Sequence, residues 1–229
     1  MPMFTGFTQE TSQFIWDLMF HNERPWFLAH KEEFQKHLKE PFDELARDTF
    51  AEVCRRHPEA GFKLHISRIY RDARRLFGRG PYKDHLWFSI KNWDGLLRGP
   101  MFWFEIGAAE YSYGMGFYSA SPAQMAAYRA AIDANPAFME RLIEPLDHQK
   151  EFRLTGEDYK RPYGDKGERL NPWYNKKWVG IECSHDFGGV ILTPELPDLL
   201  CDGFDFLMPY YEFLCRFCTE DQRDPRPRR

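Results

Sequence analysis

The sequence has no long apolar run and no recognisable export signal. No segment approaches the ~20 consecutive apolar residues that a transmembrane helix needs, so we expect no membrane association. The N-terminal sequence MPMFTGFTQE lacks a basic segment followed by an apolar run. We therefore expect no signal peptide and a cytoplasmic protein.

Cysteine is scarce, and its spacing forms neither a disulfide framework nor a metal motif. The chain has five scattered cysteines, and without an export signal we expect reduced thiols. Cys215 and Cys218 form a C-x-x-C pair, but no second such pair and no histidine pair accompanies it. The pair also falls late in an expected helix, where the helix dipole disfavours a thiolate. We therefore predict no metal site and no cofactor.

Motifs of nucleotide binding and of nucleophilic catalysis are also missing. The glycines of Gly114 to Phe117 lack the third glycine and the following helix of a dinucleotide-binding loop, so a bulge or a close backbone approach is expected there. Ser184, His185 and Asp186 are neighbours on an expected strand and point to alternating faces, so they cannot form a catalytic triad. No nucleophile–base pair can be identified in the sequence, so whether the protein is an enzyme is left open.

Apolar and aromatic residues are abundant. Hydrophobic residues make up 43% of the chain and aromatic residues 17%, which is ample for a packed core and too much for a disordered chain. At 229 residues, a single domain is the better prediction, and we place it at residues 1–222. Residues 223–229, RDPRPRR, are too polar and proline-rich to fold and are predicted to be a disordered basic tail.

The hydrophobic spacing predicts helices at both ends of the chain and strands between them. Apolar residues at three-and-four spacing indicate helices over residues 9–20, from Pro25 to Leu38, and from Pro41 to near His57. The later helices start at Ser121-Pro122, at Asn135-Pro136 and after Thr193, and Pro209 should kink or divide the last one.

Strands are expected at residues 63–71, 86–90, 101–106, 111–118, 151–156 and 179–185. No repeating strand–helix–strand rhythm appears. The predicted fold class is therefore α+β, with a mainly antiparallel sheet packed with N-terminal helices and a C-terminal helix.

The most unusual stretch is the basic segment, which we define as residues 63–85, KLHISRIYRDARRLFGRGPYKDH. It holds seven Lys/Arg and two Asp, a net charge of +5 in a chain whose net charge is −4. Alternation of Leu64 and Ile66 with polar residues predicts a strand, and an arginine then interrupts its apolar face. A buried arginine needs a carboxylate or a bound anion, and Asp72 is a nearby candidate. We predict that Arg68 or Arg71 is more than half buried and bonded to a carboxylate.

The basic segment also carries a family resemblance. Its Ser67-Arg68-Ile69-Tyr70-Arg71-Asp72, Arg74 and Pro81-Tyr82-Lys83 resemble the S-R-I-x-R-D-x-R-F-S-K-D-K-x-P-Y-K pattern of a mostly bacterial family, domain of unknown function twenty-four sixty-one. Residues 75–80, RLFGRG, depart from that pattern. Asn22, Trp26 and Phe27 resemble the family's N-N-x-x-W-F signature, and Arg129 matches the arginine of its proline-started helix. The resemblance implies family membership and supplies no activity and no catalytic residues.

Concentrated positive charge in an acidic chain favours an anion site. Our preferred interpretation is binding of, or action on, a small phosphate- or carboxylate-bearing ligand, because arginine presents a fork that fits such oxygens and a histidine can transfer protons near neutral pH. The predicted ligand-binding residues are Arg68, Arg71, Asp72, Tyr82, Lys83, His85 and Arg129.

Other interpretations stay open. A nucleic-acid interface is less favoured, given the acidic net charge and the lack of a binding motif, and a protein-interaction module without catalysis is the third alternative. The basic residues could also be a purely structural ion-pair cluster. The oligomeric state is left open.

Overall fold

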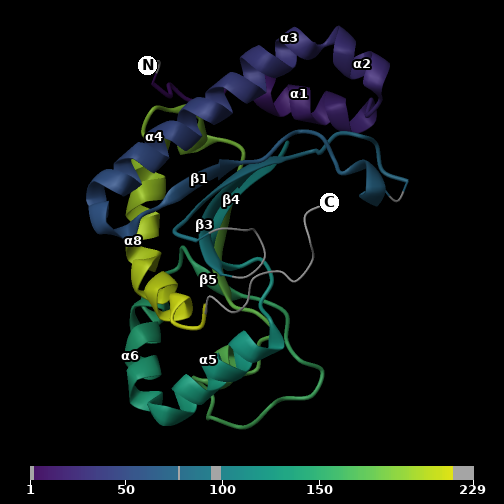
Figure 1. The fold of residues 1–229 in the computed structure, drawn as a ribbon. Helices are drawn as coiled ribbons and strands as arrows, with labels where there is room; N and C mark the ends of the chain where they lie inside the picture. The colour runs from purple at the N-terminus through teal and green to yellow at the C-terminus, as the bar shows by residue number, and fades with distance from the viewer. Residues whose placement is uncertain (1–2, 77, 94–98, 219–229) are drawn as a thin grey trace. The chain divides into compact units, whose positions relative to one another are not determined.

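The computed structural model describes residues 3–76, 78–93 and 99–218 (Figure 1). The chain divides into two compact units, which we call the first unit (residues 1–92, 103–113 and 184–205) and the second unit (residues 93–102, 114–183 and 206–229). The predicted tail at residues 223–229 lies outside the described residues. Within the described residues, no helix is both long enough and apolar enough to cross a membrane.

The first unit begins with helices. α1 (Gln9–Phe20) is followed by α2 (Arg24–Ala29), and then α3 (Lys31–Glu33), a π-helical stretch η1 (Phe34–Lys39) and α4 (Glu40–Arg56) follow without a break, as Figure 1 shows. The bounds predicted for the first helix are confirmed. The prediction that Pro41 opens a separate helix is wrong, because Pro41 lies in the first turn of α4 within this continuous helix.

The π-helical stretch has a local cause. Proline has no N–H, so Pro41 cannot bond the carbonyl four residues earlier, which belongs to His37. The Thr11 hydroxyl of α1 donates to that carbonyl at 2.6 Å. The N–H of Glu40 bonds the Gln35 carbonyl, which is the wider spacing of a π-turn. α1 thus supplies the donor that Pro41 lacks, and the helix continues through the proline.

The strands form one six-stranded antiparallel sheet in the order β1-β2-β3-β4-β6-β5. Their bounds are β1 Lys63–Ile66, β2 Leu86–Lys91, β3 Pro100–Ile106, β4 Glu110–Phe117, β5 Arg153–Thr155 and β6 Gly180–Asp186. The predicted α+β class is confirmed, with helices at both the N-terminal and the C-terminal parts of the chain.

In the first unit, β1 and β2 pair in the register Leu64↔Ile90 and Ile66↔Phe88. This alternation places apolar side chains on one face of the two strands, which α4 covers, and Lys63, His65 and Lys91 on the other. β1 is shorter than predicted and ends before Arg68. Single-turn helices η2 (Pro58–Ala60), η3 (Ala73–Arg75) and η4 (Gly189–Leu192) complete the unit's elements.

The second unit carries α5 (Pro122–Ala134), α6 (Pro136–Asp147) and the short α7 (Asn171–Tyr174). The Ser121 hydroxyl caps α5 by accepting from the Gln124 N–H, as the Ser-Pro pattern predicts. In the same unit, a Cβ on Gly114 would lie 2.2 Å from the Ile181 carbonyl oxygen, so the close backbone approach predicted for the Gly114–Phe117 stretch is confirmed.

The last helix, α8 (Leu196–Cys215), is a single element that runs through Pro209. A proline removes one helical hydrogen bond, but buried residues on both sides of it, such as Leu207 and Tyr211, keep the helix continuous. The sequence left open whether Pro209 kinks or divides the helix, and in the structure Pro209 does not divide α8.

Candidate functional site

The basic segment folds back on itself after β1. Tyr70 and Tyr82 form an antiparallel bridge. The Arg71 N–H donates to the Pro81 carbonyl at 2.8 Å, and the Lys83 N–H donates to the Ile69 carbonyl at 2.7 Å. This short ladder closes the base of the intervening loop and brings Lys83 to the side of the residues that follow β1.

Asn22 fixes this ladder to the N-terminal helices. Its side-chain oxygen accepts from the Tyr82 N–H, and its amide nitrogen donates to the Tyr82 carbonyl, both at 2.9 Å. The Phe27 ring stacks on the Tyr82 ring with centroids 4.1 Å apart. A Cβ on Gly80 would lie 2.3 Å from Asn22 Oδ1, so glycine is required there. The two signature stretches of the family pattern therefore contact each other directly.

Arg71 is the buried arginine that the sequence predicts. Its side chain is 14% exposed, its Nε donates to the Tyr82 carbonyl at 2.7 Å, and its Nη2 lies 3.0 Å from Asp84 Oδ1. Asp72, which the sequence offered as a candidate partner, instead accepts two side-chain hydrogen bonds from Arg74. Asp72 also accepts from the Arg74 N–H and so caps η3, which turns it away from Arg71.

Three cations of the segment, Arg68, Arg79 and Lys83, form no ion pair with a carboxylate among the described residues. Arg68 and Arg79 are exposed. The Lys83 ammonium lies 5.9 Å from the centroid of the Trp87 ring. Burial lowers the pKa of Lys83, Arg71 and Arg68 lower it further, and Glu105 opposes them. Burial, Lys91, Lys83 and Arg68 likewise lower the pKa of His65. Burial is the largest cause of both shifts, and the neighbouring cations add to it.

His85 lies beside two carboxylates. Its Nδ1 is 2.9 Å from Asp84 Oδ1, the same oxygen that Arg71 contacts. Burial raises the pKa of Glu105 on β3, and Asp84 and Glu110 add to that rise, while His85 and Lys83 oppose it. The site therefore combines a histidine, a lysine of lowered pKa and a glutamate of raised pKa, which is a set able to exchange protons.

Asp84 and Glu105 are not among the site residues predicted from the sequence. Asp84 lies inside the basic segment and was counted only as a charge. Glu105 is the one acid in Phe102-Trp103-Phe104-Glu105-Ile106, and a carboxylate in an otherwise apolar strand is a signal that could have identified it. Tyr82 is 2% exposed and serves as a packing residue of the site.

Arg129 lies on α5 in the second unit, whereas the other predicted site residues all lie in the first. Its own surroundings are described below.

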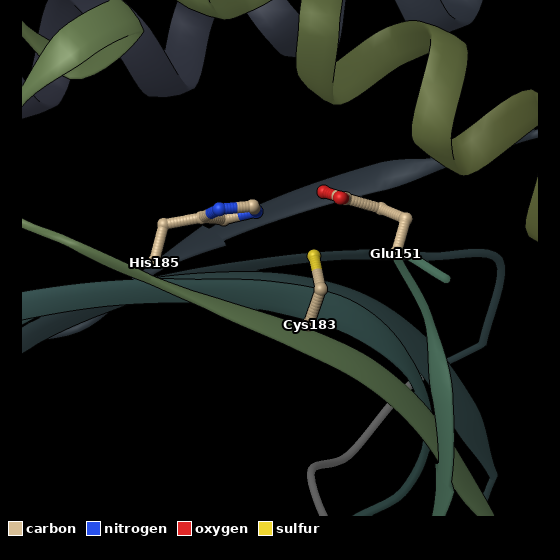
Figure 2. Close-up of side chains that lie close together, drawn as sticks. All are labelled: Glu151, Cys183 and His185. Atoms are coloured by element: carbon tan, nitrogen blue, oxygen red, sulfur yellow. The ribbon is translucent and has the colours of Figure 1, made fainter. Parts of the chain in front are cut away.

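The cysteines carry free thiols. Burial raises the pKa of Cys215 to about 12 and that of Cys218 to about 11, so neither is activated as a thiolate. Figure 2 shows Cys183 on β6, where its sulfur lies within 4.8 Å of a Glu151 carboxylate oxygen of the same unit. Thiolates and carboxylates bind zinc in other proteins, but we assign no metal to these residues.

Comparison with known proteins gives a family match. The model of a family described as "Conserved hypothetical protein (DUF2461)" matches residues 10–213. The comparison with curated proteins finds no match.

Proposed function

Because the chain belongs to DUF2461, a family of conserved hypothetical proteins, we infer its function from the residues of its own basic segment. We propose that the basic segment binds a small phosphate- or carboxylate-bearing ligand. The observation that carries the proposal is that Arg68 and Lys83 lie close enough to repel each other, and neither forms an ion pair within the part of the chain that the structure describes.

Charge repulsion supports this proposal. Burial lowers the pKa of Lys83, and Arg71 and Arg68 lower it further against the opposing effect of Glu105, so protonation of Lys83 is less favourable than that of an ordinary lysine. An anion bound between Arg68 and Lys83 would remove both the repulsion and part of the desolvation cost. A ligand that neutralises these two cations should therefore stabilise the fold, and its binding should raise the pKa of Lys83.

The residues of the segment divide into two roles. Arg68 and Lys83 contact the ligand, the former through its planar fork and the latter as a point charge. Arg71, Asp72 and Tyr82 position them, since Arg71 is engaged by Asp84 and by the Tyr82 carbonyl, and Asp72 by Arg74. His85 and Glu105 are the groups that would move a proton if the ligand is also a substrate.

The test is calorimetric titration of the full chain with inorganic phosphate, citrate and a nucleoside monophosphate at low and high salt. We expect saturable binding, and a loss of about tenfold in affinity or more for each of Arg68→Ala and Lys83→Ala. Lys31→Ala, on α3 and outside the segment, is the matched control and should bind as the native chain does.

Two outcomes would contradict the proposal. One is equal loss of affinity in the Lys31→Ala control, which would indicate attraction by general charge. The other is binding of an oligonucleotide with a steep salt dependence and no response to small anions, which would indicate a nucleic-acid interface.

A further inference from the structure

The second unit holds a buried arginine that forms no ion pair among the described residues. Arg129 projects from α5 and is 5% exposed. Its Nη1 atom is enclosed and has no hydrogen-bond partner. Removing a guanidinium charge from water is costly unless carboxylates or hydrogen-bond acceptors compensate it. Asp133 interacts with Arg129 only electrostatically, so Arg129 lacks the hydrogen-bonded carboxylate that a purely structural buried arginine usually has.

Neighbouring cations of the same unit do have such partners. Asp133 lies one turn after Arg129 on α5. It forms an ion pair with the Lys166 ammonium at 2.7 Å and accepts a hydrogen bond from the Tyr174 hydroxyl at 3.0 Å. The other pairs of this unit are Arg169–Asp147, Lys176–Asp158 and Lys177–Glu157. Among the described residues, Arg129 takes part in no ion pair, although carboxylates are common around it.

Two tyrosines contact the Arg129 guanidinium. Its central carbon lies 3.8 Å from the centroid of the Tyr163 ring and 5.7 Å from that of Tyr159. Stacking of this kind stabilises a guanidinium by less than the burial of an unpaired charge costs. It also uses the face of the guanidinium and leaves the hydrogen-bonding capacity of its N–H groups unused. Tyr163, which covers the guanidinium, is itself 58% exposed.

The loop that carries these tyrosines is held in place by Asn175. The Tyr159 N–H donates to the Asn175 carbonyl at 3.1 Å, and the Tyr163 N–H donates to Asn175 Oδ1 at 2.7 Å. Between the two tyrosines, Lys160 and Arg161 are exposed and form no ion pair among the described residues. The loop therefore presents two further unpaired cations next to the stacked guanidinium.

We propose that Arg129 and the loop from Tyr159 to Tyr163 form a second binding site, distinct from the basic segment, for a small oxyanion of the phosphate or carboxylate class. The N–H edge of Arg129 takes two oxygens of the anion, Tyr163 and Tyr159 fix the plane of the guanidinium, and Lys160 and Arg161 attract the ligand to the rim. This site does not depend on the proposed function of the basic segment.

The experiment uses the full chain carrying Arg68→Ala and Lys83→Ala, so that the first site cannot contribute. Inorganic phosphate and malonate are titrated while the side-chain Nε–H signal of Arg129, assigned by its absence in Arg129→Lys, is followed by NMR. We expect a saturable shift of that signal. The anion that gives the larger shift identifies the ligand class.

Variants locate the contact. Arg129→Lys keeps the charge but loses the fork, and affinity measured by calorimetry should fall about tenfold or more. Lys160→Ala/Arg161→Ala removes exposed charges only, so this variant should fold normally and bind more weakly, with a smaller salt dependence. An unchanged Arg129 signal with both anions, or unchanged affinity in both variants, would overturn the proposal and leave Arg129 as a packing residue of the tyrosine cluster.

Discussion

At the scale of single residues, Glu105 is a carboxyl group whose ionisation the fold opposes. Burial raises its pKa from the ordinary value of 4.5, so the folded protein binds a proton at this site more tightly than the unfolded chain does. Stability contributed by that proton is present below the ordinary pKa and is lost as the pH rises through the raised folded pKa.

We therefore expect Glu105→Gln, which mimics the protonated acid, to be more stable than the native chain above the raised pKa and nearly equal to it below 4.5. Urea unfolding at a series of pH values measures this difference. Glu140→Gln, exposed on α6, is the control and should follow the native curve. A Glu105→Gln curve parallel to the native one at every pH would show that the carboxyl is not strained.

The sequence predicted a buried arginine with a carboxylate, and Arg71 confirms it. The identity of the acid could not be predicted, because Asp72 and Asp84 are both close in sequence. Asp72 caps η3 with its own side chain. The ladder between residues 69–71 and 81–83 places Asp84 beside Arg71, and Asp84 is therefore the partner. Such a pairing depends on a fold-back that no local pattern encodes.

At the scale of elements, the contact between Asn22 and Tyr82 joins the turn after α1 to the basic segment. Asn22→Ala leaves the N–H and the carbonyl of Tyr82 without their partner, so we expect a loss of about 1–3 kcal/mol in the free energy of unfolding. Affinity for anions at the basic segment should fall as well, because the ladder that holds Lys83 is loosened.

Asn22→Asp keeps the oxygen that accepts from the Tyr82 N–H but replaces the donor with an oxygen that faces the Tyr82 carbonyl, so it should also be less stable than the native chain. Chemical unfolding and calorimetry on both variants check the expectation. Equal stability of Asn22→Ala and the native protein would show that the contact is dispensable.

The elements themselves were largely predictable, and their ends were not. The sequence predicts a strand that extends past Ile66 to Arg71, but the pairing of β1 with β2 ends at Ile66. Ser67 donates its N–H to the Trp87 carbonyl at 2.8 Å, and its hydroxyl then accepts from the Trp87 N–H at 3.0 Å in place of a backbone carbonyl. A side chain that competes with the backbone in this way ends a strand without any glycine or proline to signal it.

At the scale of the whole molecule, the boundary between the two units falls inside β3, β4, β6 and α8. Neither unit is a continuous piece of chain, and the single domain predicted from the sequence stays a prediction. Because each unit needs strands that continue into the other, we expect one cooperative unfolding transition.

Hydrogen exchange read by mass spectrometry along a urea gradient checks this expectation. Peptides from α4 in the first unit and from α6 in the second should lose protection at the same denaturant concentration. Two separate midpoints would show that the units unfold independently and that the sequence encodes two domains.

The ladder at the base of the basic segment also bears on how this sequence can diverge. Arg68 precedes the Tyr70–Tyr82 bridge and Lys83 follows it, so the placement of both depends on the closed base and not on what lies beyond it. Selection on the ligand would then act weakly within residues 75–80, which is where the chain departs from the family pattern. In this chain Gly80 is the exception, because a side chain there would displace Asn22.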